Sequence, residues 1–114
     1  MTASDFAPLP DGEYYAVIFT NRLSDDTFGY DEMAEAMALL AAEQDGYLGF
    51  ESARNAQGFG ITVSYWRDEA AILAWKQMAK HLVAQKQGQD RWYDHYITRV
   101  AKVERAYSGP EGRK

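Results

Sequence analysis

The sequence contains no cysteine. Without a thiol, the chain can form no disulfide, no thiolate nucleophile and no zinc–sulfur site. Long apolar runs are also absent, since no stretch approaches the roughly 20 apolar residues that cross a bilayer. Residues 1–10 carry no lysine or arginine, so we expect no secretory leader. Together these absences predict a cytoplasmic protein that does not enter a membrane.

Positive charge is scarce as well. The 12 Lys and Arg residues are outnumbered by 17 Asp and Glu residues, which gives a formal net charge of -5. Binding to a phosphate backbone needs a basic surface, so we expect no nucleic-acid partner. The two histidines, His81 and His95, lack the spacing of metal ligands, and no glycine-rich phosphate loop is present. We therefore expect no metal and no other cofactor.

The apolar and aromatic content is high enough for one globular domain. Hydrophobic residues make up 46% of the chain and aromatic residues 14%. Pro8, Pro10 and Gly12 disfavour regular structure at the start, so residues 1–13 are predicted to form an extended N-terminal arm. Residues 14–107 are predicted to form the domain, and residues 108–114 a polar tail.

Periodicity within the domain predicts the order of its elements. Residues 14–20 are apolar at both alternations, which is typical of a strand covered on both faces. Asp68 stands at an N-cap position before an amphipathic helix. The predicted elements are a strand at 14–20, a helix at 30–44, a strand around 48–50, a strand at 59–66, a helix from 69 to near 88, and a strand at 92–107. This βαββαβ order predicts an α+β, ferredoxin-like fold with two helices on one face of a four-stranded antiparallel sheet.

Such a sheet leaves its second face without helices. The first strand supplies apolar side chains to both faces, so that second face would be an exposed apolar patch in a monomer. The N-terminal arm and the tail are too polar and too short to cover it. We therefore predict a homodimer in which two sheets pack face to face, because two-fold symmetry is the commonest arrangement of soluble oligomers.

Three short motifs carry a family resemblance. They are Asn21-Arg22 after the first strand, Tyr65-Trp66-Arg67-Asp68 before the second helix, and Trp75 within that helix. On these motifs residues 14–107 resemble the antibiotic biosynthesis monooxygenase superfamily. The resemblance implies a dimeric α/β barrel. It also implies one of three activities: oxidation of polyaromatic phenols without a cofactor, degradation of haem, or neither of these.

The resemblance and the positions of the polar and aromatic residues define a predicted site. We predict that Asn21 and Arg67 hold a substrate anion or a peroxide, that Trp66 and Trp75 flank the substrate ring, and that His81 is the general base. The remaining predicted contacts with substrate come from Tyr65, Arg22, Gln85 and Trp92.

Structural alternatives exist for several of these residues. Trp75 lies at the centre of an apolar stripe and is equally consistent with core packing. His81 lies on a polar line beside that stripe, as a solvated surface histidine does. Arg67 stands next to Asp68, so a surface ion pair would also explain it.

The main hypothesis is a cofactor-independent monooxygenase that oxidises a small, easily deprotonated aromatic compound with molecular oxygen. The alternative is a non-catalytic dimeric module of the same fold that binds a small hydrophobic ligand, for example in a stress response. Haem degradation ranks third. By resemblance, the iron-ligating histidine of haem-degrading relatives corresponds to Gln85, and a neutral amide is a poor axial ligand.

Overall fold

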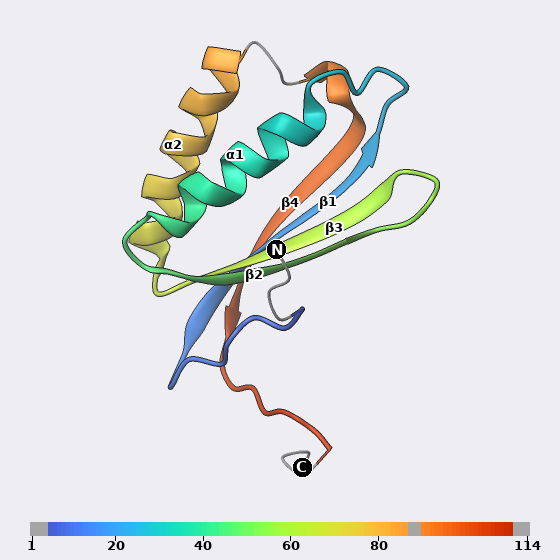
Figure 1. Cartoon of the computed structure of the whole chain (residues 1–114). Helices are drawn as coiled ribbons and strands as arrows, with labels where there is room; N and C mark the ends of the chain where they lie inside the picture. The colour runs from blue at the N-terminus through green and yellow to red at the C-terminus, as the bar shows by residue number, and fades with distance from the viewer. Residues whose placement is uncertain (1–4, 87–89, 111–114) are drawn as a thin grey trace.

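Two helices lie on one face of a four-stranded antiparallel sheet (Figure 1). This computed structural model describes residues 5–86 and 90–110. In chain order the elements are β1 (Tyr14–Leu23), α1 (Tyr30–Ala42), β2 (Tyr47–Arg54), β3 (Phe59–Trp66), α2 (Glu69–Lys86), the short 3-10 helix η1 (Asp90–Trp92) and β4 (Tyr93–Val103). The sheet order is β2-β3-β1-β4. The predicted βαββαβ, ferredoxin-like architecture is therefore confirmed.

Strand β1 occupies the interior of the sheet and pairs along its length with β3 on one side and β4 on the other. The predicted strand ended at Thr20, but β1 continues to Leu23. Its ladder persists because Asn21 pairs with both Gly60 and Tyr96, and the register shifts only after Arg22. The expectation that Asn21 and Arg22 follow the strand was therefore wrong, since both are strand residues.

Several of the remaining boundaries differ from the prediction: β2 extends to Arg54, beyond the predicted 48–50, and Trp92 belongs to η1, so β4 begins at Tyr93. Helix α1 ends at Ala42, two residues before the predicted Gln44, and the chain then turns through Gly46 at φ 92°. Strand β4 ends at Val103 and not at Tyr107. Val103 pairs with Tyr14, the first residue of β1, so the backbone beyond Val103 has no strand beside it. Strand β3 has the predicted bounds.

Alternation separates two faces of the sheet. The helix face carries Val17 of β1 and Trp66 of β3, whereas the open face carries Ile18 and Val63. Trp66 is fully buried, and its ring stacks on Trp75 of α2 with centroids 5.6 Å apart. Tyr47, Trp66 and Trp75, here called the tryptophan cluster, form one end of the core together with Ala41 and Ala71.

Helix α2 begins where the sequence predicts. The carboxylate of Asp68 accepts a hydrogen bond of 2.9 Å from the backbone N–H of Ala71, which is the geometry of an N-cap. The same contact lowers the pKa of Asp68, and the hydrogen bond from Arg67 lowers it further. Neither α2 nor α1 is long and apolar enough to cross a membrane.

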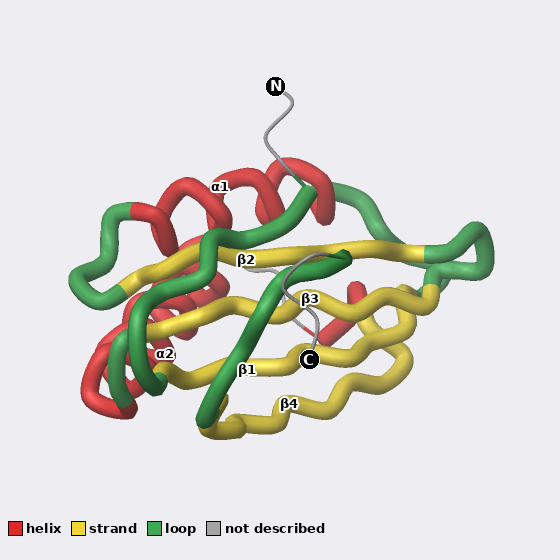
Figure 2. Tube along the Cα trace, turned by 90° about the horizontal axis from the view of Figure 1, so that it is seen from below, coloured by secondary structure: helices red, strands yellow, loops and turns green. Residues whose placement is uncertain are grey.

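The N-terminal arm and the segment after β4 cross the open face of the sheet (Figure 2). The arm is attached beside β2: the N–H of Ala7 donates to Glu51, and Ala7 and Pro8 lie against Gly49. It does not cover the rest of the face, where Ile61 and other apolar residues remain exposed. The prediction that the arm is too short to cover the open face agrees with this arrangement.

Gly46 allows the turn between α1 and β2 to approach α2. A Cβ atom at residue 46 would lie 2.6 Å from the Cβ of Ala71, and the residue has a left-handed φ. Gly12 is a matched control, because its φ is +76° and no atom lies within 4 Å of the added Cβ.

We expect Gly12→Ala to lower the free energy of unfolding by about 1 kcal/mol, the backbone penalty alone. Gly46→Ala should lower it by about 1–3 kcal/mol more, because overpacking adds to that penalty. Urea denaturation of both variants measures the difference. Equal losses would contradict the close packing of this turn on α2.

Candidate functional site

Asn21 is the buried polar side chain of the helix face. Only 2% of its surface is exposed. Within residues 5–86 and 90–110, neither its Nδ2 nor its Oδ1 has a hydrogen-bonding partner. Buried polar side chains are nearly always paired, and an unpaired one destabilises a fold by about 1–3 kcal/mol. The Asn21 amide is therefore available to pair with a molecule that enters the helix face.

Arg54 lies on β2, two strands from Asn21, and both residues pair with Gly60 of the intervening strand β3. Asn21 pairs with Gly60, and a Cβ on Gly60 would lie 2.7 Å from the Arg54 guanidinium carbon. The guanidinium therefore covers the space that Gly60 leaves empty, and the backbone of Gly60 lies about 4.8 Å across the sheet from the backbone of Asn21. Arg54 donates to the carbonyl of Gly58 at 2.7 Å and to the Tyr30 hydroxyl at 3.0 Å. Its position over the Tyr30 ring adds a cation–π contact.

Aromatic rings surround these two polar groups. Tyr30 meets Trp92 and Tyr93 edge-on, both at 5.9 Å, and Tyr93 contacts Tyr96 at 5.7 Å. Phe19, two residues before Asn21 on the same face, contacts Tyr93 at 5.4 Å and Tyr96 at 5.5 Å. We name Asn21, Tyr30, Arg54 and Tyr93 the Asn21 cluster.

Tyr93 is neutral at physiological pH. Burial raises the pKa of its hydroxyl well above the ordinary value, and the interaction with Tyr30 raises it further. A neutral phenol donates a hydrogen bond and does not accept a proton from a substrate. The Asn21 cluster therefore combines one cation, one amide and tyrosine hydroxyls, with no carboxylate or imidazole among its members.

An open hollow of about 480 Å³ adjoins the cluster at the start of β4. Tyr93, Asp94, His95 and Tyr96 line it, and Tyr96 is the strand partner of Asn21. This volume lies within the range of small-molecule sites, about 300–1,000 Å³. Tyr93 and Tyr96 are thus shared between the hollow and the aromatic rings beside Asn21.

The structure separates residues that the sequence placed in one cavity. Trp66 pairs with Tyr15 and Asn21 pairs with Gly60, so the two side chains stand six residues apart along the β1–β3 ladder. At about 3.3 Å per residue this separation is roughly 20 Å. Trp75 stacks on Trp66 and so belongs to the tryptophan cluster. Trp66 and Trp75 therefore form a packed core at the end of the sheet opposite Asn21.

Arg67 is a surface residue, as the structural alternative predicted. It is about half exposed and binds Asp45 through both guanidinium nitrogens, at 3.1 and 3.2 Å, and Asp68 at 3.2 Å. Its hydrogen bonds lower the pKa of Asp45. Arg67 joins the turn before β2 to the start of α2 and lies outside the Asn21 cluster.

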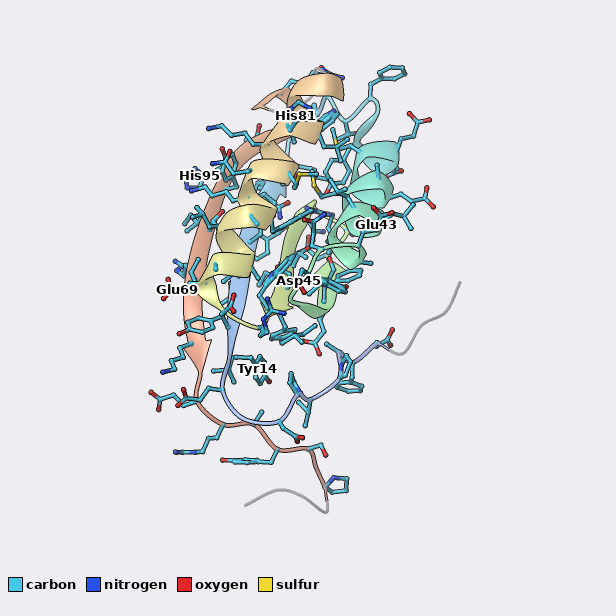
Figure 3. All side chains as sticks on the ribbon, turned by 90° about the vertical axis from the view of Figure 1, so that its left-hand side faces the viewer. Tyr14, Glu43, Asp45, Glu69, His81 and His95 are labelled. Carbon is cyan, nitrogen blue, oxygen red and sulfur yellow. The ribbon has the colours of Figure 1, made fainter. Side chains whose placement is uncertain are left out.

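His81 is exposed on α2. Figure 3 shows it toward the end of the molecule opposite Tyr14, which is the end at which Asn21 lies. Gln85 belongs to the same helix, and its side chain lies outside the described part of the structure. The contacts predicted for Gln85 remain a prediction.

The other predicted contact residues fall on both faces of the sheet. Trp92 is buried beside the Asn21 cluster, and its indole N–H donates to the carbonyl of Phe28 at 2.8 Å. Tyr65 and Arg22 lie on the open face instead. Arg22 stacks over Phe59 there, and the Tyr65 hydroxyl donates to Glu51 at 2.7 Å. Burial and the contact with Glu51 raise the pKa of Tyr65 to about 12.

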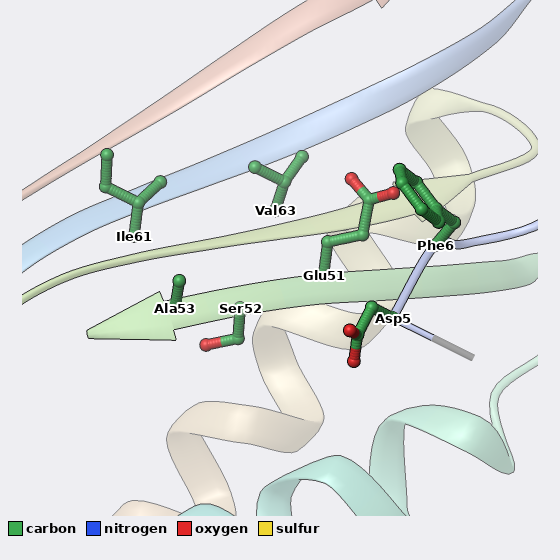
Figure 4. Close-up of a pocket in the computed structure, with 7 residues that line it drawn as sticks. All are labelled: Asp5, Phe6, Glu51, Ser52, Ala53, Ile61 and Val63. Atoms are coloured by element: carbon green, nitrogen blue, oxygen red, sulfur yellow. The ribbon is translucent and has the colours of Figure 1, made fainter. Parts of the chain in front are cut away.

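A second hollow, of about 320 Å³, lies on the open face between the N-terminal arm and β2 and β3 (Figure 4). Glu51 borders it and already accepts hydrogen bonds from Ala7 and Tyr65. The other lining residues are Asp5, Phe6, Ser52, Ala53, Ile61 and Val63, and none of the seven is a buried polar group without a partner, in contrast to Asn21. Across residues 5–86 and 90–110, no group of three or more His, Cys, Asp or Glu side chains could hold a metal ion.

The residues predicted from sequence include Asn21 and Trp92 but not Arg54, Tyr30, Tyr93 and Tyr96, which the structure places around the same end of the helix face. Arg54 and Tyr93 come from strands that lie on opposite sides of β1, so only the strand register brings them to one end of the helix face. One usable signal was Gly60, since a glycine inside a strand often marks the close approach of another group.

Comparison with known proteins identifies the family. The model of the antibiotic biosynthesis monooxygenase family matches residues 26–87 of this chain. YqjZ, an uncharacterized protein of Bacillus subtilis, is 50% identical over 96 residues, which are 84% of each chain. Jasmonate monooxygenase ABM of Pyricularia oryzae is 32% identical over 94 residues, which are 78% of this chain and 43% of that protein.

A solved structure agrees in fold. A variant of SnoaB, a cofactor-independent oxygenase from Streptomyces nogalater, superposes with a TM-score of 0.64 at 10% identity, over 82% of this chain and 95% of that one. At that identity the superposition shows the shared fold alone. The family match extends over more than half of the 114 residues and begins just before α1. The chain belongs to the antibiotic biosynthesis monooxygenase family.

Proposed function

We propose that the protein is a cofactor-independent monooxygenase that oxidises a small, easily deprotonated aromatic compound at the Asn21 cluster. The observation that carries this proposal is the buried amide of Asn21, which has no partner in the described chain. Family membership and the likeness to a jasmonate monooxygenase support an oxygenase, and the surrounding rings suit an aromatic substrate.

The reaction needs an electron-rich substrate anion. Loss of a proton from a phenol gives a phenolate, and loss of a proton from an activated methylene gives an enolate; either anion reduces oxygen directly and forms a carbon–oxygen bond. For a methylene, the resulting peroxide loses water to leave a ketone: one oxygen atom stays on the product and the other leaves as water. The four electrons that the substrate loses are the four that the oxygen molecule gains.

The protein positions the reactants and stabilises the developing charge. The Nδ2 of Asn21 donates to the enolate or peroxide oxygen, while Tyr93 and Tyr96 flank the ring. The proton passes to an imidazole, the side chain that exchanges protons most readily at neutral pH. His81 is exposed on α2, on the side of the sheet that carries Asn21, whereas His95 borders the hollow but is the strand partner of Arg22 on the open face, so His81 is the first candidate for this step and His95 the second.

Oxygen uptake with anthrone and with a naphthoquinol measures this activity directly. We expect the wild type to consume one oxygen molecule for each anthrone converted to anthraquinone. Asn21→Ala should reduce kcat at least about 100-fold, because one donor to a developing oxyanion contributes on that scale. Arg67→Gln is the control and should leave kcat unchanged, since Arg67 is a surface residue.

His95→Gln and His81→Gln identify the base. The variant that lacks the base should lose the rise of kcat with pH through the neutral range, whereas the other should keep the wild-type profile. A wild type that consumes no oxygen but retains an unaltered ligand in native mass spectrometry would contradict catalysis and favour a binding module. A Soret shift and haem breakdown on titration would instead favour haem degradation.

We also propose that the protein is a homodimer formed through the open face. Ile61 of β3 and Ile97 of β4 flank Thr20 in one row across this face, and both are at least 40% exposed. Phe6 of the arm and Tyr107 after β4 are more than half exposed. Exposed apolar groups on the sheet and on both flanking segments suit contact with a second copy.

Ile61→Lys should convert the dimer to a monomer, because it places a charge in the centre of the proposed interface. Light scattering after size exclusion measures the mass. Leu73→Lys is the control: Leu73 is 62% exposed on α2, away from the open face, so that variant should remain dimeric. A monomeric wild type would contradict the proposal.

A further inference from the structure

Arg54 is a half-buried cation without an acidic counterpart. Its guanidinium donates to one carbonyl and one hydroxyl, and no described Asp or Glu forms an ion pair with it. A guanidinium has five N–H donors, so these two bonds leave most of them available. Removing a charge from water is unfavourable unless an opposite charge compensates for it. The chain has a net charge of -5, yet no described carboxylate forms an ion pair with this helix-face cation.

The position of Arg54 is defined by Gly60. The backbone of Gly60 underlies the guanidinium, and its strand partner on β1 is Asn21. Two independent features therefore meet at one place: an unpaired amide that is almost fully buried, and a cation that lacks an anion. Tyr93 supplies no negative charge there, because burial raises the pKa of its hydroxyl and keeps it neutral.

We propose that Arg54 determines specificity by binding a carboxylate on the aromatic substrate, while Asn21 pairs with the adjacent reacting oxygen. This inference rests on the proposed function, because it takes the Asn21 cluster as the substrate site. The preferred substrate is accordingly a hydroxyaromatic acid whose carboxylate stands next to the oxidisable hydroxyl. Planar guanidinium and carboxylate groups match in paired hydrogen bonds, which a neutral phenol does not form.

Arg54 also has a structural contribution that the test has to separate. Its bonds to Gly58 and Tyr30 connect the β2–β3 turn to α1. A substitution that removes the guanidinium removes these bonds as well. Gly60→Ala resolves this ambiguity, because it keeps the charge of Arg54. The added Cβ would lie 2.7 Å from the guanidinium carbon, so the guanidinium has to move away from residue 60. The φ of Gly60 is not left-handed, so alanine fits the backbone.

Binding of 1-hydroxy-2-naphthoate and 1-naphthol, measured by isothermal titration calorimetry on the full chain, tests the inference. We expect the wild type to bind the carboxylate compound at least about tenfold more tightly, as a hydrogen-bonded charge pair allows. Arg54→Gln and Gly60→Ala should each remove this preference, so that the ratio of the two Kd values falls to about one. Arg54→Lys should keep part of the preference, because lysine retains the positive charge but lacks the planar group that forms paired hydrogen bonds with a carboxylate.

Arg22→Gln is the matched control. It removes the same charge at the same end of the sheet, but Arg22 projects from the open face, so the preference should persist. Thermal unfolding of every variant confirms that it is folded. A wild type that does not prefer the carboxylate compound, or a folded Arg54→Gln variant that keeps the preference, overturns the inference.

Oxygen uptake separates this inference from the proposed function. If the protein prefers the carboxylate compound through Arg54 but consumes no oxygen, the proposed monooxygenase activity is contradicted and the role of Arg54 in binding a carboxylate is supported. Uptake with neutral anthrone that is unaffected by Arg54→Gln, with no carboxylate preference, would support the monooxygenase and overturn the role of Arg54.

Discussion

The double pairing of β1 is the constraint on which the rest of this structure depends. Every residue from Tyr15 to Arg22 has a strand partner on both sides, so β1 fixes the register of β3 and β4 relative to each other. A slip of one residue would exchange its two faces and expose the helix-face set. Because Asn21 lies within this ladder, its backbone cannot move to find a partner for its side chain, and its position is set by the sheet.

The two ends of the helix face have different physical properties. At the Trp66 end, rings stack against each other and the indole N–H donates to Ser64, so packing and hydrogen bonding are complete. At the Asn21 end, an amide and a guanidinium lack full complements of partners among the described residues. The proposed site lies at the incomplete end, in agreement with the general observation that unsatisfied polar groups mark sites under functional constraint.

The architecture was predictable because periodicity reports which side chains share a face. The alternation of Ile61 and Val63 with Thr62 and Ser64 gave β3 its bounds, and Asp68 marked the start of α2. Strand ends were less predictable, because they depend on partners: β1 extends through Asn21 only since Gly60 and Tyr96 lie beside it.

The site was predicted only in part. Asn21 and Trp92, predicted from local sequence, lie at the same end of the helix face, but Trp66, predicted to join them, lies six residues away along the ladder, a separation that local sequence does not supply. Arg54 was missed because its neighbour in space, Asn21, is 33 positions away in the chain and belongs to a strand that is not its direct partner. Register, and not composition, decides which polar groups meet.

The central claim is that Asn21 is kept for chemistry at the expense of stability. Urea denaturation of Asn21→Leu, combined with oxygen uptake on the same preparation, tests it most directly. We predict that the variant is more stable than the wild type by about 1 kcal/mol, because it no longer buries an unpaired amide, and that it consumes no oxygen. A variant that is less stable than the wild type and still consumes oxygen at the wild-type rate would contradict the account.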